Sequence, residues 1–262
     1  MIMQFSEAEL NNLTIQPVDR WKRSAAYLEE REQVWVDQME KVVARNGHMW
    51  NGEIYSLEDI LYPGEDRMTL QMSTCEYKDL VFRMLKGQEN VANHYGEAYL
   101  FRFSGVSVVP VTRDGKFVFG IRADRSEQGT PPIGGIGGTL NKDEMEIHSF
   151  ADIRQCMLRE IQEETALECT AETLRFFGLY AVLFSYHFWF TIRLPIHSEE
   201  INQYHRPGEF SSLVAINQQE AFDTPMPMSV GFRRWRSYLH LLPFVLDGVN
   251  PAALLGTTHS GC

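Results

Sequence analysis

Basic residues are in the minority in this chain. Its 262 residues include 24 Lys and Arg against 35 Asp and Glu, which gives a formal net charge of -11 at pH 7. A nucleic-acid surface needs clustered Lys and Arg to neutralise phosphates, so the charge balance argues against a nucleic-acid partner. It leaves phosphate-bearing small molecules open, because a bound divalent cation and local arginines set the potential at a site.

Cysteine is also scarce. The chain has four, and none of them forms a Cys-x-x-Cys pair: Cys75, Cys156, Cys169 and Cys262. This spacing predicts no zinc site. The cysteines are interpreted as buried or free thiols in a reducing compartment.

Long apolar runs are missing as well. No window approaches the ~20 apolar residues of a membrane span, and Met1 to Glu7 lacks the basic start and apolar stretch of a signal peptide. The sequence therefore predicts no membrane partner and a cytoplasmic location. With 44% hydrophobic and 23% charged residues, the composition is ordinary for a globular protein, and there are no internal repeats.

The most informative stretch is an acidic one. Glu160, Glu163 and Glu164 stand at positions i, i+3 and i+4, so on a helix at about 100° per residue they share one face. Three carboxylates on one strip repel each other unless a cation lies among them, and Mg²⁺ or Mn²⁺ prefers such oxygen ligands. Taken alone, the pattern is more typical of a solvated acidic helix face.

A glycine-rich stretch ahead of this helix changes the interpretation. Residues 131 to 138 read Pro-Pro-Ile-Gly-Gly-Ile-Gly-Gly, and the acidic turn Asp143-Glu144 follows shortly afterwards. Glycine lets backbone groups approach a phosphate or a metal without a Cβ in the way. The combination predicts a site that holds a metal-bound diphosphate.

Together these residues resemble the Nudix box, Gly-x5-Glu-x7-Arg-Glu-U-x-Glu-Glu-x-Gly-U, where U is aliphatic. Gly138 to Glu144 matches the first part, and Arg159 to Leu167 matches the second. Two departures stand out. The spacer between Glu144 and Arg159 has fourteen residues (145 to 158), so we expect an enlarged loop or an earlier helix start. Ala166 replaces the box glycine, which should cost little if the helix runs on by one more turn.

The resemblance implies a fold and a reaction. The fold is an α/β fold, a Nudix-type α/β/α sandwich with a mixed β-sheet and an N-terminal α/β extension. The reaction is Mg²⁺-dependent (or Mn²⁺-dependent) hydrolysis of a diphosphate. The implied metal ligands are Glu160, Glu163 and Glu164, with a backbone carbonyl from Gly137 or Gly138. Arg159 is expected to anchor the helix by pairing with one of the glutamates, and the general base is Glu163 or, less favoured, Glu209 from the region after the box.

Substrate contacts are expected on both sides of the glycine stretch. Arg122 and Arg125 follow a predicted strand, where they could reach substrate phosphates, since Arg matches phosphate geometry. Arginines that merely end a strand at the surface are an equal alternative. The other residues expected to contact substrate are Gly137, Gly138 and Glu144.

Three segments are predicted along the chain. Residues 1–98 form the α/β extension, residues 99–247 the catalytic domain, and residues 248–262 a flexible tail. Helices are expected over 24–44 and 76–86 and again over 232–246. The aromatic residues Trp35, Trp50 and Tyr77, with Asn51-Gly52, loosely resemble extensions in the branch that hydrolyses UDP-sugars, although ordinary extension core is the favoured reading of these aromatics.

The box does not identify the group on the diphosphate. The first hypothesis is cleavage of a nucleoside diphosphate linked to another group X, such as the sugar of UDP-glucose. A nucleoside triphosphate or ADP-ribose pyrophosphatase is the alternative enzyme, and a non-hydrolytic Nudix-fold module that senses a nucleotide is the alternative from another class. The expected partner is a small-molecule nucleotide substrate, and a homodimer is left open.

Overall fold

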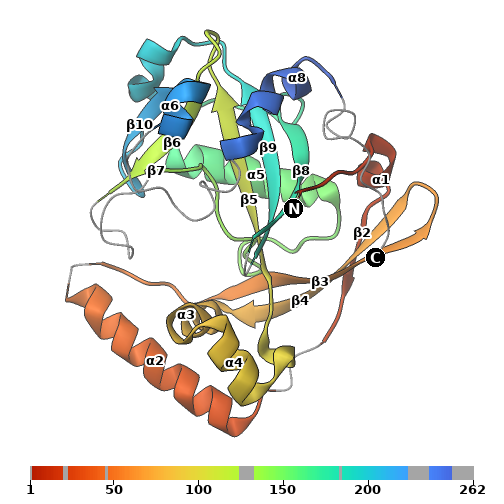
Figure 1. The fold of residues 1–262 in the computed structure, drawn as a ribbon, viewed down its shortest axis with the longest axis vertical. Coiled ribbons are helices and arrows are strands. Elements are labelled where there is room, and N and C mark those ends of the chain that lie inside the picture. The colour runs from red at the N-terminus through yellow and green to blue at the C-terminus, as the bar shows by residue number, and fades with distance from the viewer. Residues whose placement is uncertain are drawn as a thin grey trace.

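The computed structural model of the chain describes residues 2–19, 23–44, 47–123, 133–182, 185–223 and 236–249. Within these ranges ten strands form one mixed sheet, whose main path is β1-β8-β9-β5-β3-β4-β2 (Figure 1). β6 pairs with β5, β7 and β10 off this path. The strands are β1 Ile2–Met3, β2 Thr14–Pro17, β3 Glu53–Gly64, β4 Arg67–Glu76, β5 Phe103–Val111, β6 Phe117–Arg122, β7 Ile133–Gly134, β8 Arg175–Val182, β9 Ser185–Arg193 and β10 Phe210–Ile216.

The sheet is mixed because two of its strand pairs are parallel. β5 runs parallel to β9, and β2 runs parallel to β4, while the other pairs are antiparallel. The α-helices are α1 Glu7–Asn11, α2 Ala25–Val43, α3 Tyr77–Lys86, α4 Gln88–Tyr95, α5 Phe150–Glu164, α6 Gln218–Asp223 and α8 Leu242–Leu246. Short 3₁₀ helices are η1 Glu97–Tyr99, η2 Ser198–Tyr204 and η3 Arg236–Leu241. In the described ranges, no helix is long and apolar enough to cross a bilayer.

Each face of the central strands has its own hydrophobic core. Along β5, Val106 and Val108 belong to the core that contains α5, while Val109 and Val111 belong to the core under η3 and α8. This alternation follows from the period of two in a strand. Figure 1 shows α5 on one side of the sheet and α6 and α8 on the other. The predicted α/β/α sandwich with a mixed sheet is confirmed.

The N-terminal extension shares its sheet and core with the rest of the chain. Tyr55 and Leu57 of β3 lie in the same buried cluster as Ile153 and Ile161 of α5. β3 also pairs with β5, with Ser56 opposite Phe103. The predicted boundary at residue 98 stays a prediction, but it divides elements that fold around one core. Most of the predicted tail, residues 250–262, lies outside the described residues.

The predicted helices are found close to their expected limits. α2 corresponds to the helix predicted over 24–44. It begins after the N-cap residue Ser24, whose hydroxyl accepts a hydrogen bond from the Tyr27 amide. α3 corresponds to the helix predicted over 76–86. It ends at Gly87, whose φ of 84° suits glycine. The described part of the third is η3 and α8, and residues 232–235 lie outside the described ranges.

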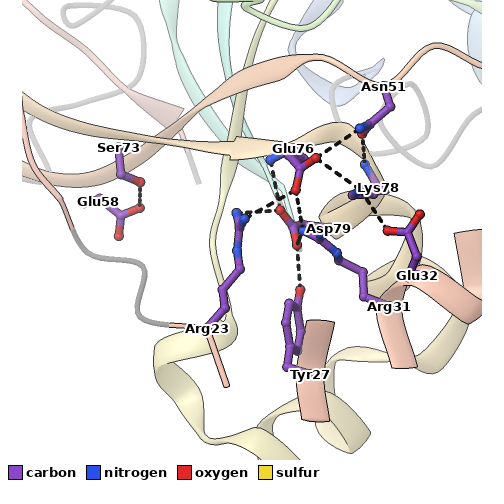
Figure 2. Close-up of polar contacts among 10 residues, drawn as sticks. All are labelled: Arg23, Tyr27, Arg31, Glu32, Asn51, Glu58, Ser73, Glu76, Lys78 and Asp79. Atoms are coloured by element: carbon purple, nitrogen blue, oxygen red, sulfur yellow. Dashed lines mark hydrogen bonds and ion pairs between the residues drawn. The ribbon is translucent and has the colours of Figure 1, made fainter. Parts of the chain in front are cut away.

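Inside the extension, a buried ionic network joins α2 to α3 (Figure 2). The Asp79 carboxylate is almost fully buried and accepts from Tyr27 Oη at 3.0 Å and Arg31 Nη1 at 2.7 Å. Arg23 Nη2 lies 2.6 Å from its other oxygen. Glu76 pairs with Arg31 at 2.7 Å and Lys78 at 3.2 Å, and accepts from Asn51. A buried charge is tolerated when it is paired in this way.

Candidate functional site

α5 carries the acidic residues and is fixed at both ends. Ser149 and Asp152 form a reciprocal capping box at its start, nine positions before Arg159, so the helix does start early within the long spacer. Its apolar stripe, including Ile153, Met157 and Ile161, is fully buried in the core. That burial fixes which way the other face of the helix points.

The end of α5 differs from the expectation about Ala166. The helix does not run on: Thr165 is its C-cap in an extended conformation with φ of -140°, and its hydroxyl donates to the Ile161 carbonyl at 2.6 Å. The Ala166 amide donates to the Tyr204 carbonyl at 2.7 Å. Because the chain leaves the helix extended, this position does not need the left-handed conformation that a glycine would supply.

The glycine stretch lies along the edge of β5. Gly138 accepts from the Val106 amide at 2.9 Å, and Ile136 accepts from the Val108 amide at 2.9 Å. At Gly137, with φ of 143°, a Cβ would come within 2.2 Å of the Val106 carbonyl oxygen. Glycine is required here because the two backbones approach too closely for a side chain.

Two of the three predicted glutamates meet this glycine stretch. The Gly137 amide donates to Glu164 Oε2 at 2.7 Å. The Glu160 carboxylate lies against Gly138, where a Cβ would be 2.4 Å from Glu160 Oε1. Glu164 is only 6% exposed, and no donor within the described residues reaches its Oε1 atom. The structure thus brings Glu160, Glu164, Gly137 and Gly138 together.

Glu209, predicted from the region after the box, joins this group. It precedes β10, and its carbonyl accepts from the Ala123 amide at 2.9 Å, which holds it beside the end of β6. Its carboxylate forms an ion pair with Arg122. Glu209 also lies close enough to Glu164 to raise the pKa of that carboxyl.

The electrostatics of the group favour uncharged carboxyls. Burial and then the neighbouring Glu209 raise the pKa of Glu164 well above its usual range, although the Gly137 amide lowers it. Burial raises the pKa of Glu160 to about 7; Arg159 opposes this shift, and the charges of Glu163, Glu209 and Glu144 add to it. Close carboxylates with too few cations are stabilised either by protons or by a bound cation.

Arg159 lies on the other side of Glu160. It forms an ion pair with Glu144, while its Nη2 atom is 3.7 Å from Glu160 Oε1 and its Nε atom is 3.5 Å from Glu163 Oε1. The predicted pairing of Arg159 is therefore present, with Glu144 as its nearest carboxylate. Glu144 reaches α5 despite the long spacer, and its predicted contact with substrate stays a prediction.

Glu163 is set apart from Glu160 and Glu164. Its side chain is 60% exposed, against 14% for Glu160. Across the described residues, no group of three His, Cys, Asp or Glu side chains stands in an arrangement that could hold a metal ion. The single helical turn thus does not form a three-carboxylate cage, and the roles of Glu163 as ligand and as base stay predictions.

Although no three of the described carboxylates stand in a preformed metal-binding arrangement, their donor chemistry fits a divalent cation. Glu164 Oε1 is buried without a donor, Glu160 and Glu209 add oxygen atoms nearby, and the missing Cβ at Gly138 leaves its backbone open to the Glu160 carboxylate. Hard cations such as Mg²⁺ take oxygen donors of this kind and keep several waters. The residues that would hold the cation are Glu160, Glu164 and Glu209.

Arginines also lie near the site. Arg122 is placed beside it, whereas the predicted Arg125 lies outside the described residues. Arg206, which the sequence did not single out as a functional residue, donates to the Gln162 carbonyl near the end of α5. No local pattern could identify that contact, because it joins segments that are 44 positions apart.

No protein-family model and no curated protein sequence matches the chain. Solved structures similar to it carry the Nudix fold, the fold of the family that the sequence resembles. A NUDIX hydrolase from Alicyclobacillus acidocaldarius is 11% identical, with 56% of this chain and 96% of that chain covered at a TM-score of 0.44.

Two other structures give similar values. The NUDIX domain of Shewanella oneidensis NrtR, complexed with ADP ribose, is 16% identical and covers 59% of this chain and 97% of its own at a TM-score of 0.42. A MutT protein from Methanosarcina mazei is 13% identical, with 53% and 94% covered at a TM-score of 0.39. These identities and TM-scores are too low to transfer a substrate or a residue role.

Proposed function

We propose that this protein is a Mg²⁺-dependent hydrolase of the Nudix type, which cleaves the diphosphate of a nucleoside diphosphate linked to another group X. One observation carries the proposal. Two carboxylates, Glu160 and Glu164, meet Gly138 and Gly137, Glu209 lies near both of them, and the pKa values of Glu160 and Glu164 are raised. Perturbed carboxyls gathered in this way are typical of functional sites.

Each residue of the group has a distinct part in the proposed reaction. Glu160, Glu164 and Glu209 would hold the cation, which would supply positive charge to the diphosphate oxygens and make water more acidic. Arg122, at the edge of the group, contacts a phosphate in bidentate fashion. Its ion pair with Glu209 keeps the guanidinium in place before substrate arrives.

Glu163 is the proposed general base. It is exposed and stands outside the converging carboxylates, with Arg159 Nε 3.5 Å away to orient it. A water oxygen forms a bond to one phosphorus, the bond from that phosphorus to the bridging oxygen breaks, and the bridging oxygen leaves with the electron pair. Glu163 accepts the proton of the attacking water.

The first candidate for X is a sugar, as in UDP-glucose. A nucleoside triphosphate or ADP-ribose is the alternative substrate, and nucleotide sensing without cleavage is the alternative function. The cytoplasmic location and a homodimer remain predictions. The carboxylates gathered at the glycine stretch support the enzyme, because a binding module needs no metal-ligating acidic group to recognise a nucleotide.

The test is a panel of nucleotide sugars, nucleoside triphosphates and ADP-ribose, incubated with Mg²⁺ and with EDTA. Products are detected by chromatography and by phosphate release after a phosphatase. We expect one class to be cleaved with Mg²⁺ and spared with EDTA. Binding of a panel member without any product would favour the sensing module instead.

A pair of Glu→Gln variants tests the base. Glu163→Gln should lower kcat by about 10²- to 10⁴-fold with little change in Tm, because the water loses its proton acceptor. Glu199→Gln is the matched control: Glu199 is an exposed glutamate in η2, so its replacement should leave kcat unchanged. A wild-type kcat in Glu163→Gln would remove Glu163 from the role.

A further inference from the structure

The segment that carries Glu144, residues 140 to 147, is bound to β3 of the N-terminal extension. Main-chain bonds join Tyr55 to Leu140 and Lys142 to Glu53, at 2.9 and 2.8 Å. The Glu53 amide donates to Asp143 Oδ2 at 3.0 Å, and the Ile147 amide donates to Tyr55 Oη at 3.1 Å. The chain on both sides of Glu144 is therefore tied to β3.

Tyr55 and Asp143 hold this segment from two sides. The Tyr55 ring is buried in the same core as α5, so its hydroxyl has a fixed position relative to the helix. Asp143 reaches back to the start of β3, where Gly52 has no Cβ to block it: a Cβ there would lie 2.3 Å from Asp143 Oδ2. Between these two anchors lies Glu144.

The position of Glu144 decides where Arg159 rests. Arg159 is surrounded by Glu144, Glu160 and Glu163, and it pairs with Glu144 while remaining 3.7 Å from Glu160 Oε1. Glu163 is contacted by the Nε atom of Arg159, whereas the Nη2 atom, which pairs with Glu144, has Glu160 Oε1 as its next carboxylate oxygen. If Glu144 moved away, Nη2 would therefore turn to Glu160. An arginine bound to Glu160 would compete with a cation for the same carboxylate oxygens.

We infer that Tyr55 and Asp143 are positioning residues through which the extension holds Glu144 against Arg159 and so keeps Glu160 available to the cation. This inference rests on the proposed function only for the identity of the ion. It makes the extension part of the catalytic unit.

The test measures Mn²⁺ affinity by isothermal titration calorimetry on the full chain, with hydrolysis as a second readout. Tyr55→Phe removes the acceptor of the Ile147 amide but keeps the ring. We expect the Kd for Mn²⁺ to rise about three- to tenfold. Replacing a residue that orients a metal ligand typically lowers metal affinity by at least this factor. At saturating Mn²⁺, kcat should stay close to the wild-type value.

Tyr27→Phe is the matched control. It also removes a buried tyrosine hydroxyl of the extension, the one that donates to Asp79 (Figure 2), and it does not touch the spacer. It should lower Tm as Tyr55→Phe does and leave the Kd for Mn²⁺ unchanged. Asp143→Ala should raise the Kd as well, and Asp143→Asn, whose side-chain oxygen can still accept from Glu53, should restore it.

The outcomes separate this inference from the proposed function. A wild-type Kd in both Tyr55→Phe and Asp143→Ala would overturn the inference, and so would an equal rise in Tyr27→Phe. Mn²⁺ binding by the wild-type chain without hydrolysis of any substrate would refute the enzyme and leave the positioning role standing. No Mn²⁺ binding at all would overturn both.

Discussion

Two ionic clusters in this molecule differ in how far cations neutralise their carboxylates. In the extension, Arg23, Arg31 and Lys78 contact the carboxylates of Glu76 and Asp79, and Lys78 also contacts Glu32, so cations and anions balance there. At the glycine stretch, Arg122 and Arg159 are the cations paired with five glutamates, Glu144, Glu160, Glu163, Glu164 and Glu209. The first cluster is complete in itself, and the second still needs positive charge.

The pKa values of the two clusters record this difference. Burial alone would raise the pKa of Glu76, but the hydrogen bond from Asn51 and the charges of Arg31 and Lys78 lower it instead. At the glycine stretch, burial raises the pKa values of Glu160 and Glu164, and other glutamates add to the shift. A paired cluster stabilises the fold, whereas an under-paired one is suited to binding a cation.

The largest expected effect is on the complete cluster. Asp79→Asn should destabilise the protein by about 3–5 kcal/mol, because it removes the buried one of the two carboxylates that compensate Arg23 and Arg31. Urea denaturation followed by circular dichroism measures this loss. A cost below about 1 kcal/mol would show that the network is not essential to the fold.

A smaller effect is expected from the pH dependence of the under-paired cluster. The pKa of Glu160 is about 7 in the folded chain against an ordinary value of 4.5. Because the folded value is the higher one, the stability that this carboxyl contributes is complete below pH 4.5 and is lost as the pH rises through 7. The loss is on the order of 3 kcal/mol.

Urea denaturation in EDTA between pH 4 and pH 8 tests this prediction. The difference in unfolding free energy between Glu160→Gln and wild type should grow in favour of the variant across that range, since glutamine does not ionise. If the two curves run parallel instead, Glu160 does not have a raised pKa in the protein.

A divalent cation should supply the charge that the second cluster lacks. At a free Mg²⁺ concentration of 100 times the Kd, the wild-type chain should gain about 2.7 kcal/mol of stability. Glu164→Gln should lose most of that gain, and the exposed Glu199→Gln should retain it. An equal gain in all three proteins would place the ion elsewhere.

Much of the second cluster could be predicted from the sequence because its pattern is local. The spacing of Glu160 and Glu164 places both on one helix face, and the glycines at 137 and 138 indicate a close backbone approach. Glu209 was expected from the region after the box, and the structure places its carboxylate beside that of Glu164.

The rest depends on packing that spacing cannot specify. Glu163 shares the helix face with Glu160 and Glu164, but the rotation of α5 about its axis, set by the burial of Ile153, Met157 and Ile161, leaves it exposed. The bond between Tyr55 and Ile147 joins residues 92 positions apart. Asp79 and Tyr27 carry no motif, so their pairing could not be predicted either.

The smallest expected effect lies at the rim of the complete cluster. Glu32 contacts Lys78 at 2.8 Å, but its side chain is 53% exposed. Solvent screens such a pair, and holding two long side chains together costs entropy, so Glu32→Gln should change stability by less than about 1 kcal/mol. A cost close to that of Asp79→Asn would mean that the network acts as one unit out to its exposed edge. A negligible cost would confine its stabilising effect to the buried carboxylate of Asp79. That result would sharpen the contrast with the glycine stretch, where the buried carboxylates of Glu160 and Glu164 have too few cations.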